Sequence, residues 1–239
     1  MRCGGTISGN NSGLRATNNG TGALSVTTTG AIAGTTGAGI FLVNQGSDLT
    51  VNANDVTGFV HGINANNPGT GAVTINVSGT ATATRIPVSS VTNSSGISVN
   101  QVNGTDITIA VNNASGGTYG ISTDNQGGST GGNTSISVTG TVSGGTGSPV
   151  GPRGAISAIH SNSGALTIDL QGTATSAVGT GIIATTSAQS TTATINANDI
   201  TAAADGMSLT HSGSGALTVT VSGDVTGGTG AGIAVTAGS

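Results

Sequence analysis

The stretch from Gly215 to Ala237, GALTVTVSGDVTGGTGAGIAVTA, decides the fold of this 239-residue chain. Its apolar residues alternate with small polar ones, pause at a glycine, resume briefly, and after a glycine-rich turn form a third short run. Alternation with a period of two residues is typical of β-strands with one buried face. Three short strands separated by tight turns predict one coil of a β-solenoid.

The same unit recurs along the whole chain. When the first strand of each copy is aligned, the anchor residues are Leu24, Leu49, Val73, Ile107, Ile136, Leu166, Ala193 and Leu217. Two distant copies are nearly identical, VNANDVT at residues 51–57 and INANDIT at residues 195–201. The repeats predict an all-β parallel β-helix of about eight to nine three-strand coils. It forms one elongated domain over residues 1–239, with a partial coil at residues 1–20.

One apolar column marks the third strand of every coil. It contains Leu14, Ile40, Ile63, Ile97, Ile121, Ile156, Ile182, Met207 and Ile233. In a parallel solenoid such side chains point inward and stack on their equivalents at the strand spacing of about 4.8 Å. Burial of each methylene contributes about 0.8 kcal/mol, so these residues can build a core without any aromatic side chain.

A polar column follows, where each third strand enters its turn. Its members are Asn18, Asn44, Asn67, Gln101, Asn125, His160, Thr186 and His211. Stacked side-chain amides can hydrogen-bond to one another along the solenoid axis. We therefore predict a structural polar ladder. His160 and His211 stand two coils apart, about 10 Å, which is too far for direct sharing of a metal ion.

Composition excludes several classes of function. Charged residues make up 5% of the chain, its four basic residues are all arginines, and the net charge is −4. Without a basic stripe we expect no nucleic-acid binding. No apolar run reaches the roughly 18–20 residues of a membrane helix, so we expect no membrane insertion. The glycine strings carry no phosphate-loop information in so glycine-rich a chain, and we expect no cofactor. A single cysteine, Cys3, allows no internal disulfide.

Two coils carry insertions at the same corner, at residues 82–95 and 143–154. These segments hold two of the four arginines and three of the four prolines, and the only tyrosine falls at the same corner between them. Binding sites concentrate on loops held by rigid scaffolds, so this edge is the predicted partner-binding edge. Its residues are Arg85, Pro87, Val88, Tyr119, Pro149 and Arg153. The alternative is that both insertions are tolerated decoration of the solenoid.

Asp199 and Asp224 fall in one column of neighbouring coils, about 4.8 Å apart along the backbone. That spacing is close to the carboxylate separation of about 5–5.5 Å in retaining glycosidases, and it could also suit a calcium ion. The chain has no lysine or glutamate to support such chemistry. Surface carboxylates in turns are therefore the favoured interpretation of this weak pair, and we expect no catalytic and no metal-binding residues.

The repeats resemble a known family in GALSVTTTG, GAVTINVSG, GALTIDLQG and GALTVTVSG, each followed by a glycine-rich turn and a further strand. Similar repeats form the passenger domains of autotransporters, the β-helical proteins of type V secretion in Gram-negative bacteria, of the pertactin or AIDA-like adhesin kind. The resemblance implies a right-handed β-helix, exported through the outer membrane to the cell surface or secreted. It also implies a role in adhesion, autoaggregation or virulence. The chain would be one fragment of such a passenger.

We therefore expect a non-enzymatic surface module, either a structural stalk or an adhesin. Its partner would be a host-cell or matrix surface, or the same protein on another cell, and open strand edges would favour end-to-end or lateral self-association. One alternative is a carbohydrate-active β-helix, a lyase or hydrolase that uses Asp199 and Asp224. Another is an ice-binding solenoid, which needs regular threonine ranks on a flat face. TATAT at residues 80–84 comes near this pattern, but we expect no pair of threonine columns across the coils.

Overall fold

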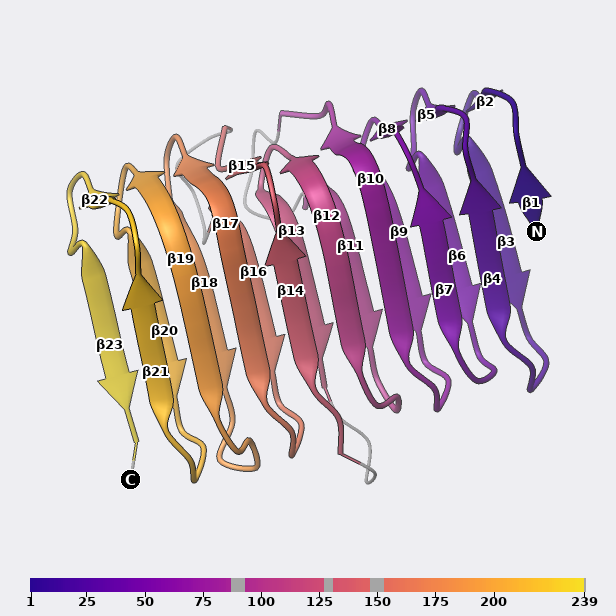
Figure 1. Cartoon of the computed structure of the whole chain (residues 1–239). Helices are drawn as coiled ribbons and strands as arrows, with labels where there is room; N and C mark the ends of the chain where they lie inside the picture. The colour runs from indigo at the N-terminus through magenta and orange to yellow at the C-terminus, as the bar shows by residue number, and fades with distance from the viewer. Residues whose placement is uncertain (87–92, 127–130, 147–152, 239) are drawn as a thin grey trace.

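A computed structural model describes residues 1–86, 93–126, 131–146 and 153–238. In these residues the chain forms 23 β-strands and no helix. Every strand pairs in parallel with its counterpart one coil away. The strands form two stacked sheets that run the length of the molecule (Figure 1). The prediction of a right-handed parallel β-helix is confirmed: strands of the near sheet rise, strands of the far sheet descend, and the winding advances from the N- to the C-terminus (Figure 1).

The larger sheet contains the first and second strands of the coils. The first strands are β1 (Arg2–Cys3), β4 (Leu24–Thr28), β7 (Leu49–Ala53), β10 (Val73–Ala83), β12 (Ile107–Ser115), β14 (Thr134–Val138), β17 (Leu166–Ser176), β19 (Ala193–Ala202) and β21 (Leu217–Val221). Four of them, β10, β12, β17 and β19, continue through the corner and include the second strand. The separate second strands are β2 (Ile7–Gly9), β5 (Ile32–Gly34), β8 (Val56–Gly58), β15 (Thr141–Gly144) and β22 (Val225–Gly227).

The smaller sheet contains the third strands only. They are β3 (Leu14–Asn18), β6 (Ile40–Asn44), β9 (His61–Asn67), β11 (Ser95–Gln101), β13 (Tyr119–Asn125), β16 (Gly154–His160), β18 (Thr180–Thr186), β20 (Met207–His211) and β23 (Ile233–Ala237). They stack in chain order from β3 to β23.

The inward apolar column of the smaller sheet is confirmed. The strand register pairs Leu14 with Ile40 and continues coil by coil to Met207 and Ile233. The column is buried from Leu14 to Met207, and Ile233 on the last strand is 42% exposed. Both phenylalanines lie outside this core, so the hydrophobic cluster of the described residues contains no aromatic ring.

The alignment of the first strands is wrong in one coil. Thr134, and not Ile136, pairs with Ile107 on one side and Leu166 on the other. Thr134 is fully buried at a position that other coils fill with an aliphatic side chain. Its hydroxyl group accepts a hydrogen bond from Nδ2 of Asn125 at 3.2 Å, which satisfies a buried polar atom that the sequence pattern could not place in the core.

The register also locates the two insertions. Ala83 pairs with Gly58 and Ser95 pairs with His61, so residues 84–94 replace the short corner at residues 59–60. Gly144 pairs with Ser176 and Gly154 with Thr180, so residues 145–153 replace the corner at residues 177–179. Both extra segments therefore leave the solenoid at the corner between the second and third strands.

Candidate functional site

The corner aspartates hydrogen-bond to the backbone of the next coil. Oδ1 of Asp55 accepts the N–H of Thr80, and Oδ1 of Asp199 accepts the N–H of Asp224, both at 2.9 Å. Equivalent bonds of 2.7–2.9 Å join Asp48 to Ala72, Asp106 to Asn133, Asn133 to Ala165, Asn113 to Thr141 and Asp205 to Ala231. In each bond the accepting side chain precedes the donor by one coil. These residues cap turn amides that the strand ladder leaves without a partner.

Glycine makes room for the caps. Gly79 directly precedes the donor Thr80, and Gly223 directly precedes the donor Asp224. A Cβ atom at either glycine would collide with Oδ1 of the accepting aspartate. Part of the high glycine content is therefore explained by the close approach of a side chain to the backbone of the neighbouring coil.

The weak carboxylate pair has a structural role in this arrangement. Asp199 uses Oδ1 to hold the backbone of Asp224, and Asn113 makes the same bond to Thr141 without a negative charge. An uncharged residue thus suffices for the interaction. In the described residues no three His, Cys, Asp or Glu side chains come close enough to hold a metal ion.

The polar ladder has its predicted register and is continuous over its first three members. Asn18 donates from Nδ2 to Oδ1 of Asn44 at 2.8 Å, and Asn44 donates in the same way to Asn67 at 2.9 Å. The same Nδ2 groups also donate to the turn carbonyls of Gly22 and Ser47. The ladder therefore fixes both the spacing of the coils and the shape of each turn.

Gln101 interrupts the ladder. Its strand pairs in register with Asn67 and Asn125, but neither amide atom of its buried side chain makes a hydrogen bond with the described residues. Glutamine is one methylene longer than asparagine, so its amide group is displaced from the line of the ladder. The amide-to-amide chain does not continue beyond this coil.

Histidine–threonine pairs replace the amides further along. Nδ1 of His160 lies 2.9 Å from the hydroxyl of Thr134, and Nδ1 of His211 lies 2.7 Å from that of Thr186. Nε2 of His211 donates to the carbonyl of Gly215 at 3.0 Å. Burial lowers the pKa of His160. These contacts support the predicted structural role of both histidines.

His61 is buried at the start of β9. The backbone N–H of Ser95, one coil on, donates to its Nδ1 at 3.3 Å. Burial lowers the pKa of His61 from 6.5 to about 4, and the charge of Arg85 adds to this shift. The imidazole is therefore neutral at physiological pH. The Ser95 N–H occupies Nδ1, so the ring proton is on Nε2.

The described residues of the predicted partner-binding edge differ in exposure. Arg85 and Tyr119 are partly exposed, whereas Arg153 is 3% exposed and lies 3.5 Å from the hydroxyl of Thr118 through Nη1. Arg153 is therefore too buried to contact a partner directly. Burial raises the pKa of Tyr119, opposed by a hydrogen bond with Ser157 and by the charge of Arg153. Pro87, Val88 and Pro149 lie outside the described residues.

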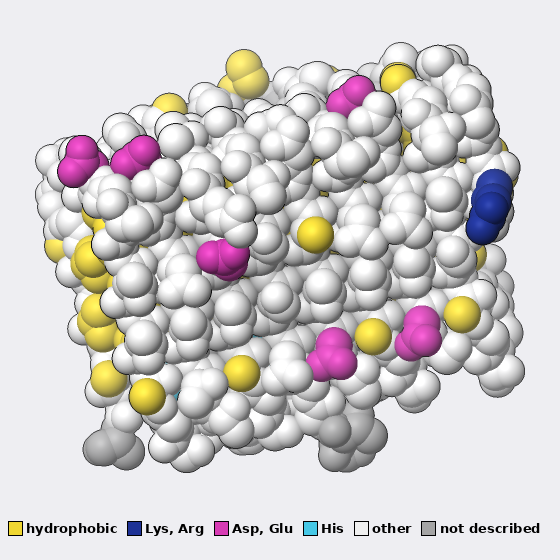
Figure 2. Space-filling view, in the orientation of Figure 1, with side chains coloured by type: hydrophobic (Ala, Val, Ile, Leu, Met, Phe, Trp, Pro, Cys, Tyr) yellow, Lys and Arg dark blue, Asp and Glu magenta, His cyan; other side chains and the backbone are white. Residues whose placement is uncertain are grey.

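The outer face of the larger sheet carries regular columns of hydroxyl groups. One column follows the first strands: Ser25, Thr50, Thr74, Thr108, Ser135, Thr167, Thr194 and Thr218. A second follows the second strands from coil to coil: Thr57, Thr82, Ser115, Ser143, Thr175, Thr201 and Thr226. All of these side chains are partly or fully exposed. Figure 2 shows the result, a face of mostly uncharged side chains with isolated aspartates.

These are hydroxyl columns rather than threonine columns, since serine occupies two positions in each, and the expectation of no pair of threonine columns stays a prediction. The sequence pattern did not reveal the hydroxyl columns because the corner between the two strands varies in length: the register shifts between Val77 and Thr80 and again between Leu170 and Thr173. Seven residues separate Thr50 from Thr57 and eight separate Thr74 from Thr82. A search at fixed spacing misses a column that the strand pairing aligns.

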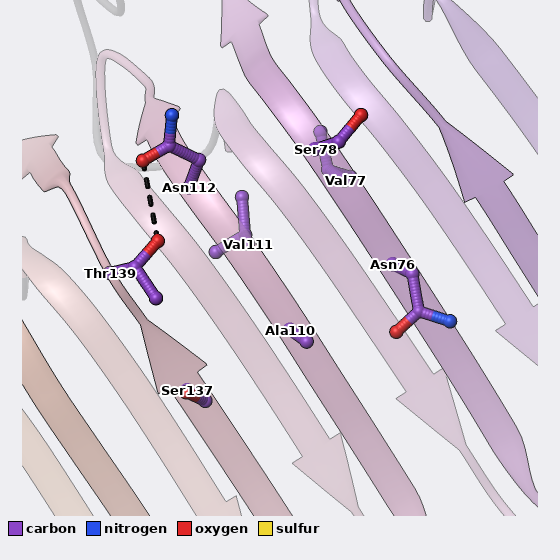
Figure 3. Close-up of a pocket in the computed structure, with 8 residues that line it drawn as sticks. All are labelled: Asn76, Val77, Ser78, Ala110, Val111, Asn112, Ser137 and Thr139. Atoms are coloured by element: carbon purple, nitrogen blue, oxygen red, sulfur yellow. Dashed lines mark hydrogen bonds between the residues drawn. The ribbon is translucent and has the colours of Figure 1, made fainter. Parts of the chain in front are cut away.

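Shallow hollows lie along the corner between these two columns. One, of about 360 Å³, spans β10, β12 and β14, and Figure 3 shows its polar lining, including Asn76, Asn112 and Thr139. Thr139 donates to Oδ1 of Asn112 at 3.3 Å. A second hollow, of about 390 Å³, continues over β17, β19 and β21 and includes Asp169 and Gln171. This corner offers amide and hydroxyl groups to a ligand, and Asp169 is the one charged residue among the side chains that line the two hollows.

Comparisons with protein-family models, with curated proteins and with solved structures give no match. A search of the described residues finds no helix that is long and apolar enough to cross a membrane.

The cap at Asp199 predicts a specific pattern of stability. Asp199→Ala should lower the free energy of unfolding by about 0.5–1.5 kcal/mol, because the N–H of Asp224 loses its acceptor. Asp199→Asn should remain within about 0.5 kcal/mol of wild type, since an amide oxygen fills the same role at Asn113. Urea denaturation of the three proteins measures both effects. Equal destabilisation by the two substitutions would show that the charge, and not the acceptor, matters.

The buried His61 predicts a pH dependence of stability. Its pKa is lower in the folded chain, so the unfolded chain binds the extra proton between pH 6.5 and about 4. The contribution of His61 to stability is complete above pH 6.5 and declines by about 3 kcal/mol as the pH falls to 4. His61→Gln should lose this part of the decline, as measured by urea denaturation at pH 7 and pH 4. The difference between the two proteins cancels the titration of the aspartates, and parallel curves would contradict the prediction.

Proposed function

We propose that this chain is a non-enzymatic module of a bacterial cell-surface or secreted protein, part of an autotransporter passenger, that serves as a stalk or an adhesin. The repeats resemble those of such passengers, and the β-solenoid is the fold that the resemblance implies. The observation that carries the proposal is the use of the polar side chains. Corner aspartates, ladder asparagines and two histidines form hydrogen bonds between coils or to turns. These bonds support a structural role for the side chains rather than a catalytic one.

The role of a stalk follows from the way the coils are joined. Each coil is bonded to the next by parallel strands, by buried aliphatic columns and by side-chain caps at the corners. Eight to nine coils at a strand spacing of about 4.8 Å give a body about 40 Å long. Because neighbouring coils are joined along their whole length, such a body is stiff and can hold an attached segment away from a cell surface. Open edge strands such as β23 could add end-to-end or lateral contacts between copies.

The adhesive role belongs to the corner where copies of the repeat differ most. Ile86 is 64% exposed and Phe59 is 41% exposed. Arg85, which precedes Ile86 in the chain, donates its N–H to the carbonyl of Phe59 at 2.8 Å. Tyr119 lies at the same corner one coil further on from Ser95. Exposed apolar side chains next to an arginine on a rigid edge are typical of protein-contact surfaces.

Replacement of both insertions tests the adhesive role. Residues 84–94 are exchanged for Phe-Val, the corner at residues 59–60, and residues 145–153 for Ala-Val-Gly, the corner at residues 177–179. Cells that display the edited chain should lose attachment to host cells or matrix and should no longer aggregate. Circular dichroism and resistance to proteolysis control for folding. Unchanged attachment would remove the adhesive corner from the proposal, and a wild-type chain without attachment or aggregation would leave only the stalk.

A second candidate function, ice binding, is favoured by the two hydroxyl columns on the larger sheet. Hydroxyl groups in one column repeat at the strand spacing of about 4.8 Å, so they could order water in a regular array. The hollows between the columns interrupt the flat surface, and for this reason ice binding ranks second.

Inhibition of ice recrystallisation tests the second candidate. Thr108→Tyr places a bulky ring in the centre of the first column and should abolish an ice-binding activity of the wild-type chain. Ser122→Tyr, on the outer face of the smaller sheet, is the matched control and should retain it. An inactive wild-type chain, or equal effects of the two substitutions, would exclude this function.

A further inference from the structure

Rare residue types gather in one hollow on the outer face of the smaller sheet. The hollow has a volume of about 260 Å³ and lies over β3, β6 and β9. It is lined by Asn11, Ser12, Arg15, Gly37, Ala38, Phe41, Val60, His61 and Asn64. A cation, an aromatic ring, a histidine and two amides thus meet in a chain whose charged residues make up 5% and aromatic residues 1%.

Strand register brings the central side chains together. Arg15 pairs with Phe41, and Phe41 pairs with Asn64, so these three residues occupy one outward column of successive coils. Further along, the column continues as Ser98, Ser122, Ser157, Ile183 and Ser208. The arginine and the phenylalanine therefore lie in a column whose other side chains are mostly small and polar.

Arg15 is held over the aromatic ring. Its guanidinium carbon lies 5.0 Å from the centroid of Phe41, within the range of a cation–π contact. The residues that line the hollow include no aspartate, and the charge of Arg15 has no carboxylate partner among them. A guanidinium group presents N–H donors in a planar fork that matches a carboxylate bidentately. The guanidinium group of Arg15 thus suits an anionic group with two oxygen atoms, such as a carboxylate.

His61 lines the hollow and provides a neutral hydrogen-bond donor. Its side chain is 9% exposed, and the Ser95 N–H donates to its Nδ1 at 3.3 Å. The ring proton is therefore on Nε2, where it can only be donated. Asn11, Ser12 and Asn64 add amide and hydroxyl groups, which both donate and accept hydrogen bonds.

We propose that this hollow binds one carboxylate-bearing sugar ring, a hexuronic acid. The carboxylate pairs with Arg15, the C–H groups of the ring lie against Phe41 and Val60, and the hydroxyl groups bond to the amides and to His61. The volume lies below the about 300–1,000 Å³ of typical ligand pockets, which fits a single ring rather than a longer segment. The inference rests on the proposed function as a binding module, since it names a ligand class for that module.

Titration of the whole purified chain with glucuronate, followed by NMR or calorimetry, tests the proposal. Glucuronate should bind at least about tenfold more tightly than glucose, because glucose lacks the charge-assisted bonds to the guanidinium group. Arg15→Gln should weaken glucuronate binding by about tenfold or more. Arg2→Gln is the matched control, since it removes the same charge from β1 of the opposite sheet and should leave binding unchanged. Phe41→Leu should weaken binding of the ring but not abolish folding, as Phe41 lies outside the core.

Several results would overturn the proposal. They are equal affinity for glucuronate and glucose, binding of inorganic sulfate as tight as that of glucuronate, and an Arg15→Gln chain that binds like wild type. The attachment assay separates this inference from the proposed function. If glucuronate does not bind while cells still attach through the insertion corner, the sugar site fails and the adhesin stands. If glucuronate binds but attachment is absent, the adhesin fails and the site stands.

Discussion

Each strand of this molecule hydrogen-bonds to its counterpart one coil away, and the rest of the structure depends on this pairing. Parallel ladders place equivalent residues at the strand spacing of about 4.8 Å, so any side chain that recurs in the repeat becomes a column. Inward columns must be buried and are mostly aliphatic, as the series from Leu14 to Met207 shows. Corner columns must satisfy turn amides, which the aspartates and asparagines do.

The same constraint limits where a ligand can be recognised. A column that repeats without change gives every coil the same surface, so distinct sites arise only where the repeat is interrupted. Arg15 and Phe41 interrupt a column of mostly small residues on the smaller sheet. The segments at residues 84–94 and 145–153 interrupt the corner between the second and third strands. Both candidate binding regions therefore lie where the chain departs from the repeat unit, of which Gly215–Ala237 is an example without insertions.

Much of the fold was predictable because apolar periodicity reports burial directly, as the isoleucines of the third strands show. The pattern failed at Thr134, since a buried threonine with hydrogen-bond partners looks like a surface residue in the sequence. It also missed the cap at Asp199, whose partner is a backbone amide in another coil. The glycine before each capped amide, such as Gly79, was the available signal. Nothing in the sequence indicated the burial of Arg153. The alignment of Leu14 with Ile40, by contrast, already implied that Arg15 and Phe41 are neighbours.

The caps have a consequence for assembly. In each described cap from Asp48 to Asp205, the acceptor belongs to the earlier coil and the donor to the later one. A coil that joins the C-terminal side of an existing stack therefore meets carboxylate and amide oxygens already in position for its turn amides. A coil that joins the N-terminal side instead supplies the acceptor oxygens, which bond to turn amides of the stack that were exposed to water. The stack thus has two chemically unlike ends: the C-terminal end presents acceptor oxygens and the N-terminal end presents turn amides.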